Sequence, residues 1–110
     1  MKEKKQKGIN REAFLVPHLF DDKKLKQIPT RNGYGEGLVE AGKADKSIVV
    51  LCADLTESTR SLAFKEAFPD RFVQMGVSEQ SMASIAAGMA MAGKTPFISS
   101  YACFSPGRNW

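Results

Sequence analysis

One acidic residue stands where the chain is best suited to chemistry. Residues 71–74 are predicted to form a short strand, and Gly76 is the residue type that lets a strand turn sharply into the next element. Ser78 then stands at the N-cap position of a predicted helix over 78–92, so Glu79 falls in the first helical turn. Ligands of α/β proteins bind outside the carboxyl ends of parallel strands, where such corners lie. Glu79 is therefore the first candidate for a ligand-binding or catalytic carboxylate.

The residues around Glu79 leave two explanations open for it. No Lys or Arg follows Glu79 until Lys94, so its carboxylate either faces water or takes a partner from the fold or from a ligand. An acid in a first helical turn also complements the helix dipole without any further role. The local pattern alone therefore does not decide between chemistry and helix stabilisation.

The elements that must position this corner follow a β-α-β-α-β order after an initial helix. The expected elements are a helix from an N-cap at Thr30 to Gly42, a strand over 47–53, a helix over 59–68 that stops at Pro69, the strand over 71–74, the helix over 78–92 and a strand over 95–99. The segment 47–53 is continuously apolar and rich in β-branched residues, which is typical of a strand covered on both faces. The predicted fold is α/β, a parallel sheet with flanking helices that is truncated after its third strand.

Two stripes of side chains mark the predicted helix over 78–92. One stripe is Met82, Ile85 and Met89, and the other is Ala83, Ala86, Ala87 and Ala90. Small residues on one face let a backbone approach closely, as a helix packed against a sheet or a partner subunit requires. We interpret both stripes as core or packing surface.

Loops at the carboxyl ends of the predicted strands carry the other candidate residues. Asp54, Leu55 and Ser58 follow the first strand, Val77 and Glu79 follow the second, and Tyr101 and Phe104 follow the third. Because these strand ends share one edge of the sheet, the loops are expected to act together. Each candidate also has a structural explanation: Asp54 as a turn or capping acid, and the apolar residues as cover for the core.

The segment Gly76-Val77-Ser78-Glu79-Gln80-Ser81-Met82 resembles the Gly-Ile-x-Glu-Gln/His-x-Met signature of the pyrimidine-binding domain of transketolases and related thiamine-diphosphate enzymes. The similarity covers about residues 30–110 and includes the stretches 29–31, 52–56, 67–72 and 99–104. Several matched stretches in one order make the resemblance specific, whereas the Gly-x-x-Glu element alone is weak. The resemblance implies a partial pyrimidine-binding domain over residues 30–110, preceded by a basic leader or linker over residues 1–29.

The resemblance also implies roles for individual residues. In the family, the glutamate that corresponds to Glu79 hydrogen-bonds a ring nitrogen of the aminopyrimidine of thiamine diphosphate and so activates the reactive thiazolium carbon. Further implied cofactor contacts are Asp54 and Leu55 near the thiazolium, Val77 as apolar support, and Tyr101 and Phe104 as walls of the aminopyrimidine site. Tyr101 departs mildly from the family, which has Phe there.

Arg31 and Ser58 match transketolase residues that hold the phosphate of a sugar-phosphate substrate. An Arg fork with a hydroxyl is a sensible phosphate clamp, although Arg31 has the alternative of a solvated residue at a helix start. No Gly-Asp-Gly element for the diphosphate and its Mg²⁺ occurs in the 110 residues. The implied cofactors are therefore thiamine diphosphate and Mg²⁺, with the metal ligands on a partner chain or domain and none here.

The resulting hypothesis is a transketolase whose pyrimidine-binding half this chain supplies, inactive without a diphosphate-binding partner chain or domain. It transfers ketol groups between sugar phosphates within a homo- or hetero-oligomer, commonly across a dimer. One alternative is the pyrimidine domain of a 1-deoxyxylulose-5-phosphate synthase or a 2-oxoacid dehydrogenase beta subunit. A second alternative, of another class, is a truncated interaction module without catalytic activity.

Composition and charge exclude several other classes. The net charge of +4 is concentrated in residues 1–31, which alone carry +5, and this part lacks Arg clusters, so nucleic-acid binding is not expected. The longest apolar run, 83–92, is too short to span a membrane, and no apolar signal segment follows the first lysines, so a cytoplasmic setting is expected. Cys52 and Cys103 lie in apolar segments and are expected to be buried free thiols. His18, the single histidine, is interpreted as a surface or packing residue within a docking or linker segment over 9–25.

Overall fold

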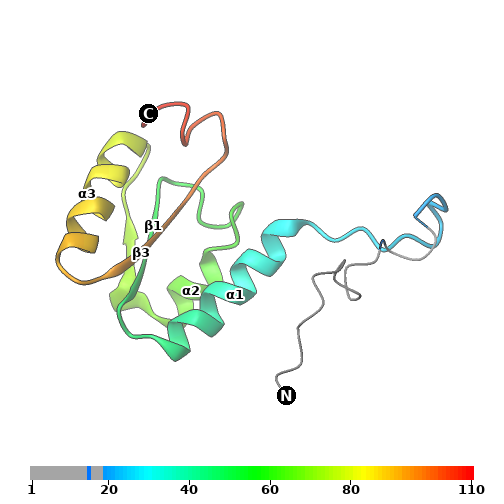
Figure 1. Cartoon of the computed structure of the whole chain (residues 1–110), viewed down its shortest axis with the longest axis horizontal. Coiled ribbons are helices and arrows are strands. Elements are labelled where there is room, and N and C mark those ends of the chain that lie inside the picture. The colour runs from blue at the N-terminus through cyan, green and yellow to red at the C-terminus, as the bar shows by residue number, and fades with distance from the viewer. Residues whose placement is uncertain (1–14, 16–18) are drawn as a thin grey trace, which may run out of the picture.

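The computed structural model describes residues 15 and 19–110, and its centre is a three-stranded parallel sheet. In chain order the elements are α1 (Thr30–Ala44), β1 (Ile48–Cys52), α2 (Leu62–Ala67), a 3-10 turn η1 (Pro69–Arg71), β2 (Phe72–Gln74), α3 (Glu79–Met91) and β3 (Thr95–Ser99). The strand order is β2-β1-β3, with every pair parallel (Figure 1). The predicted α/β fold with a parallel sheet and flanking helices is confirmed.

Every residue of β1 is buried, because helices cover the sheet on both faces. Val49 and Leu51 point to one face, where they pack with Met82 and Ala86 of α3. The alternate residues of β1 point to the other face, where Ile48 and Val50 pack with Leu38 of α1 and Phe64 of α2. The continuous apolar run thus forms a central strand with two cores, as predicted.

Two ends of the predicted helices differ from the structure. Pro29 occupies the N-cap of α1, and Thr30 is its first helical residue rather than its cap. Gly42 does not end α1, which continues to Ala44, because the glycine lies buried against the rings of Phe64 and Phe68. Arg71 caps this end of the helix from outside, since its guanidinium donates a 2.8 Å hydrogen bond to the Gly42 carbonyl.

The predicted helix over 59–68 is shorter in the structure, where α2 spans Leu62–Ala67. Residues 56–61 form turns instead, and Arg60 adopts a positive φ of 66°, which a continuous helix does not allow. The side chain of Thr59 donates a 2.7 Å hydrogen bond to the Leu55 carbonyl, so this carbonyl has a partner within the loop. The polar residues after β1 therefore belong to a structured loop rather than to a helix.

The chain turns before α3 as predicted, but the side chain of Ser78 does not cap the helix. Gly76 has a φ of +66°, a conformation that glycine adopts without a steric penalty. Ser78 stands at the N-cap of α3, but its hydroxyl makes no capping bond and donates instead to the Met75 carbonyl at 2.7 Å. The hydroxyl therefore tightens the turn, and Glu79 is the first residue of the helix.

The two predicted stripes of α3 are only partly buried within this chain. Met82 and Ala86 are buried against the sheet, and Met89 packs on the same cluster, but Ile85 is 41% exposed. Ala87 and Ala90 face outward. The buried side of the helix is thus a mixture of the two stripes.

One of the two expected buried thiols is not buried. Cys52 is buried in β1, as predicted, and both cysteines are free. Cys103 is exposed, and that prediction is wrong because residues 102–109 form successive turns after β3 rather than an extended strand end. Among residues 15 and 19–110, no helix is long and apolar enough to cross a membrane.

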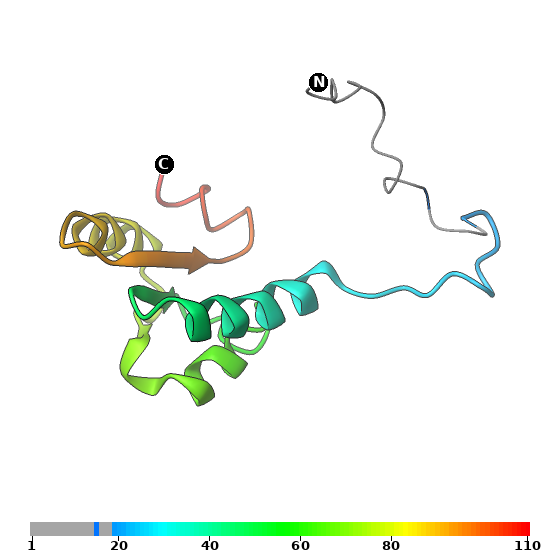
Figure 2. The same ribbon diagram turned by 60° about the horizontal axis from the view of Figure 1, so that its bottom comes forward.

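The segment before α1 leads away from the sheet and helices in both views (Figures 1 and 2). Several of its apolar residues are exposed, with Phe20 at 98% and Ile28 at 57%. A salt bridge of 3.4 Å joins Lys24 to Asp21 within it. The interpretations of His18 and of the lysine-rich start fall on residues outside those described.

Gly42 gives a test of the packing between α1 and α2. A Cβ at this position would lie 2.6 Å from Cε2 of Phe64, so Gly42→Ala is expected to lower the free energy of unfolding by about 1–3 kcal/mol. Gly37 in the same helix has no atom within 4 Å of its Cβ position, so Gly37→Ala is expected to raise stability by up to about 1 kcal/mol. Urea unfolding of the two variants measures both changes. Equal effects would show that α1 does not pack closely at Gly42.

Candidate active site

The loops that follow the strands meet at one edge of the sheet. Cys52, the last residue of β1, is in register with Gln74 on one side and Ser99 on the other, so the three strands end side by side. The last residues of the chain then turn back toward the N-terminal end of α3 (Figure 1). This edge carries all the residues that the sequence singled out.

Glu79 is buried at this edge, with 4% of its surface exposed. Its Oε2 lies 3.7 Å from Nη1 of Arg108, whose side chain is half exposed. Burying a carboxylate is costly unless it is paired, and Arg108 supplies the opposite charge. The partner of Glu79 thus comes from the fold, 29 positions along the chain, and no sequence pattern pointed to Arg108.

Arg108 also lies over the ring of Phe104, with 4.8 Å between its guanidinium carbon and the ring centroid. The planar guanidinium of Arg108 therefore contacts both the buried carboxylate of Glu79 and the ring of Phe104. Val77, Ser78 and Glu79 line a hollow of about 570 Å³ together with Arg108. This hollow therefore presents a carboxylate and a guanidinium, and Trp110 is the aromatic side chain in its lining.

A side chain from β2 holds the loop after β1. The backbone N–H of Asp54 donates to Oε1 of Gln74 at 3.0 Å, and Nε2 of Gln74 donates to Thr56 Oγ1 at 3.1 Å. Asp54 has a positive φ of 59°, an uncommon conformation that Asp tolerates better than most residues. Asp54, Leu55 and Ser58 line a small hollow of about 330 Å³. Gln74 is a positioning residue that the sequence pattern did not reveal.

The two residues expected to hold a phosphate share one pocket. Arg31 at the start of α1 and Ser58 in the loop after β1 line a cavity of about 620 Å³, and Tyr101 lines it as well. Arg31 is exposed to solvent, as a residue that binds an incoming anion must be. Ser58 borders both this cavity and the small hollow at Asp54, so the two spaces adjoin.

The predicted aromatic pair does not line a single space. Tyr101 lines the pocket of Arg31 and Ser58, whereas the ring of Phe104 lies against the guanidinium of Arg108. A turn over 101–104, closed by a 2.8 Å hydrogen bond from the Phe104 N–H to the Tyr101 carbonyl, connects the two residues. The structure therefore divides the candidates between a carboxylate side at Glu79 and an anion side at Arg31.

Two buried hydroxyls on the anion side were not among the predicted residues. Tyr34 Oη and Ser100 Oγ are buried, and both residues line the pocket of Arg31. Burial raises the pKa of the Tyr34 phenol, while the nearby hydroxyls of Ser99 and Ser61 offset part of that shift. Tyr34 falls one helical turn after Arg31, and this i, i+3 spacing is the signal that could have identified it.

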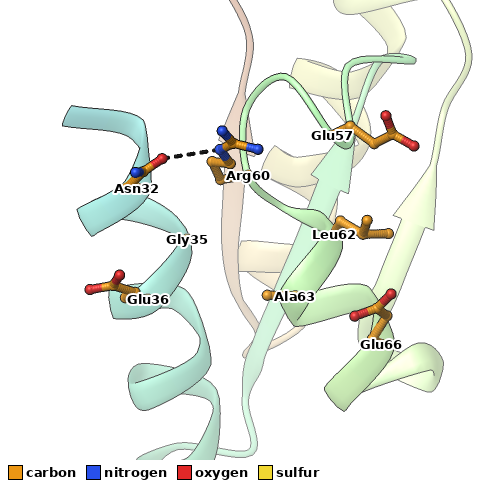
Figure 3. Close-up of a pocket in the computed structure, with 8 residues that line it drawn as sticks. All are labelled: Asn32, Gly35, Glu36, Glu57, Arg60, Leu62, Ala63 and Glu66. Carbon is orange, nitrogen blue, oxygen red and sulfur yellow. Dashed lines mark hydrogen bonds between the residues drawn. The ribbon is translucent and has the colours of Figure 1, made fainter. Parts of the chain in front are cut away.

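A further hollow of about 420 Å³ lies between α1 and α2 and contains none of the predicted site residues (Figure 3). Nε of Arg60 donates to Asn32 Oδ1 at 3.1 Å across it, and Glu36, Glu57 and Glu66 line it. Within residues 15 and 19–110 no three His, Cys, Asp or Glu side chains are grouped to hold a metal ion. The acidic residues of this hollow therefore do not form a metal site.

The fold is an α/β domain with a parallel sheet, and a buried glutamate stands at the start of a helix at the carboxyl edge of that sheet. The chain belongs to the family of the transketolase pyrimidine-binding domain, whose family model matches residues 26–110. The recognition of this family from the Glu79 segment is thereby confirmed.

Individual relatives agree with this assignment. A putative transketolase C-terminal section from Methanocaldococcus jannaschii is 50% identical over 80 residues, which cover 73% of this chain and 25% of the relative. Human transketolase is 41% identical over 90 residues, or 81% of this chain and 14% of the relative. A solved structure described as a split gene transketolase, inactive beta4 tetramer, superposes with a TM-score of 0.68 at 48% identity, covering 76% of this chain and 28% of that one. The chain thus spans about a quarter or less of the length of these relatives.

The pairing of Glu79 with Arg108 is testable in the full chain without any ligand. Unfolding in urea of Glu79→Gln, Arg108→Gln and the double variant forms a double-mutant cycle. A coupling of about 0.5–1 kcal/mol is expected, because Arg108 is half exposed to solvent, and it should weaken in high salt. Strictly additive effects would show that the two side chains do not interact.

The burial of Tyr34 predicts a pH dependence of stability. Because the pKa of the Tyr34 phenol is raised in the folded chain above its ordinary value near 10, the folded state keeps its proton where the unfolded state loses it. Stability is therefore expected to fall as the pH rises beyond about 10. Tyr34→Phe removes this contribution, so urea midpoints measured from pH 9 to 11 should decline less steeply in the variant. Parallel curves would contradict the burial of the phenol.

Proposed function

We propose that this chain supplies the pyrimidine-binding half of the thiamine-diphosphate site of a transketolase, which transfers ketol groups between sugar phosphates. The observation that carries the proposal is the buried Glu79 carboxylate. It lies beside the guanidinium of Arg108, which also lies over the ring of Phe104. The family of the chain and its transketolase relatives support the same function.

The residues at Glu79 fit one role in that reaction. Glu79 would hold a proton between its carboxylate and a ring nitrogen of the aminopyrimidine, and its burial keeps water from competing for that proton. Phe104 would offer a ring face to the aminopyrimidine, with Val77 as apolar support. Asp54 and Leu55 would line the site from the loop that Gln74 holds in place. Thiamine diphosphate, when bound, supplies the carbanion chemistry, and the protein orients it.

The residues on the anion side fit a phosphorylated substrate. Arg31 is the one charged side chain among the residues that line the pocket shared with Ser58. A guanidinium and a hydroxyl suit the oxygens of a phosphate, and Tyr101 would close the pocket near the sugar. The hollow at Asp54 adjoins this pocket through Ser58, so a substrate held at Arg31 would lie next to the loop after β1.

A partner must complete the site. The chain holds no Gly-Asp-Gly element for a diphosphate, so we assign the diphosphate contacts and the Mg²⁺ ligands to a partner chain or domain. A homo- or hetero-oligomer, a dimer in the simplest case, would bring the halves together, and without it the chain is inactive. The split-gene relative described as an inactive tetramer supports this arrangement. Free thiols at both cysteines agree with a cytoplasmic setting in carbohydrate metabolism, within the pentose phosphate pathway.

One alternative within the same cofactor chemistry has a specific observation in its favour. A 1-deoxy-D-xylulose-5-phosphate synthase from Clostridium perfringens is 31% identical over 102 residues, or 90% of this chain and 16% of the relative. The transketolase relatives are more similar, and Arg31 and Ser58 share one pocket, so we favour ketol transfer. An exchange assay with two sugar phosphates separates the two reactions, because only a transketolase returns a second sugar phosphate.

The test uses the full chain mixed with a candidate diphosphate-binding chain, titrated with thiamine diphosphate and Mg²⁺ in a calorimeter. Saturable binding is expected only in the mixture. In Glu79→Gln, ketol transfer is expected to fall by at least about 100-fold, because the proton at the ring nitrogen is no longer shared with a carboxylate. Glu40→Gln, at an exposed glutamate of α1, is the matched control and should retain full activity.

Two results would count against the proposal. Absence of binding with every diphosphate-binding partner tried would overturn the catalytic function and leave a non-catalytic interaction module. Full activity in Glu79→Gln would show that another acid performs the proton transfer, since a merely structural glutamate tolerates the amide. Retained binding with lost activity in this variant is the pattern expected of a residue that acts on the cofactor.

A further inference from the structure

We propose that Gln74 controls the anion affinity of the pocket at Arg31, which it does not line, because it sets the conformation of the loop that carries Ser58. It acts as a positioning residue, through Asp54 and Leu55, and touches no ligand itself. The inference rests on the proposed function in one respect, the assignment of the Arg31 pocket to a phosphate. It adds a residue of β2 to a pocket that is lined by α1 and by the loops after β1 and β3.

Gln74 is the last residue of β2 and lies beside the end of β1. Its Cα is in register with that of Cys52, and the N–H of the next residue, Met75, donates a 2.8 Å hydrogen bond to the Cys52 carbonyl. The pairing of the two strands therefore fixes the backbone of Gln74 relative to the loop that leaves β1. From this fixed position the side chain reaches the first residues of that loop.

The side-chain amide of Gln74 bonds two residues of the loop. Its Oε1 accepts a 3.0 Å hydrogen bond from the Asp54 N–H, and its Nε2 donates a 3.1 Å hydrogen bond to Thr56 Oγ1. These two residues flank Leu55, so the bonds hold Leu55 from both sides. Asp54 has a φ of 59°, in the left-handed region that residues with a Cβ enter at a cost. Gln74 thus stabilises a backbone conformation that Asp54 does not favour by itself.

The carbonyl of Leu55 connects this part of the loop to Ser58. It accepts hydrogen bonds from the Thr59 N–H at 2.9 Å, from the Thr59 hydroxyl at 2.7 Å and from the Ser58 hydroxyl at 3.3 Å. The place of Leu55 therefore determines where residues 58 and 59 lie, and both of them line the pocket of Arg31. A rotation of the backbone at Asp54 would move the Leu55 carbonyl and displace Ser58 from the pocket.

The far end of the loop is tied to α1, and this limits the effect that Gln74 can have. Nε of Arg60 donates a 3.1 Å hydrogen bond to Oδ1 of Asn32, the neighbour of Arg31 in α1 (Figure 3). Loss of Gln74 therefore leaves the loop attached at one end, and it lowers the population of the binding conformation without unfolding the loop. The apparent affinity for an anion falls by the same factor as that population.

The test measures phosphate binding and loop conformation in the full chain without thiamine diphosphate. Inorganic phosphate is titrated into the chain and followed by phosphorus NMR. Gln74→Met removes both hydrogen bonds at nearly the same side-chain size, and Thr56→Val removes only the bond to the hydroxyl. Gln27→Met is the matched control, because it makes the same change at an exposed glutamine before α1. A double variant adds Asp54→Gly to Gln74→Met, since glycine adopts a positive φ without a steric penalty.

Gln74→Met is expected to weaken phosphate binding about three- to tenfold, the effect of roughly one hydrogen bond on the loop equilibrium. Thr56→Val should weaken it less, and Gln27→Met should leave it unchanged. The added Asp54→Gly should recover part of the loss, which a merely structural role of Gln74 does not predict. The Asp54 amide should exchange with solvent faster in Gln74→Met, whereas the amides of β1 should keep their rates because they report on the whole fold.

Three results would overturn the inference. These are an unchanged phosphate affinity in Gln74→Met, a loss of affinity that Asp54→Gly does not reduce, and no phosphate binding by the unmodified chain. Failure of the proposed function is a separate result, because it appears as absent ketol transfer in the mixture with a diphosphate-binding chain. Phosphate binding that depends on Gln74 together with absent ketol transfer would retain the inference and reject the reaction. Ketol transfer together with phosphate binding that does not depend on Gln74 would do the reverse.

Discussion

The burial of β1 on both faces is the interaction on which the rest of the structure depends. Ile48–Cys52 provides the apolar surface for α3 on one side and for α1 and α2 on the other. The same strand pairs in parallel with β2 and β3, which fixes where both of them end. All loops at this edge take their positions from one strand, so a change of register in β1 would displace Glu79 and the anion pocket together.

The sequence predicts well those features that depend on the residues of one short segment. The apolar run of β1 and the glycine before α3 act locally, and their outcome agrees with the pattern. The predicted bounds of β3 agree with the structure. Proline near the start of a short apolar segment is compatible with the beginning of a strand and disfavours a helix there. Gly42 was misjudged, since glycine ends helices through its backbone but here serves the close approach of two phenylalanine rings. That purpose is visible only after α1 and α2 are packed.

In the candidate site, too, local features could be predicted from the sequence, whereas contacts between distant residues could not. Glu79 could be selected from its place at a strand-to-helix corner, but its partner Arg108 lies in a turn that no periodicity defines. Gln74 likewise looks like an ordinary strand residue until the register of β1 and β2 brings it to the Asp54 loop. Cys103 was expected in a buried strand end, and the turns after β3 expose it. Local sequence patterns therefore do not identify the partners that candidate site residues have far along the chain.

Under the proposed function, the separation of charge along this edge would let one small domain serve two demands. Proton sharing with a ring nitrogen requires a carboxylate shielded from water, and Glu79 meets this by burial at the start of α3. Capture of a phosphate requires an accessible cation, and Arg31 meets this at the exposed start of α1. Were the two groups in one hollow, Arg31 would pair with Glu79 and would no longer be free for an anion. Arg108 neutralises Glu79 on its own side, which leaves Arg31 as the charge that an incoming anion meets in its pocket.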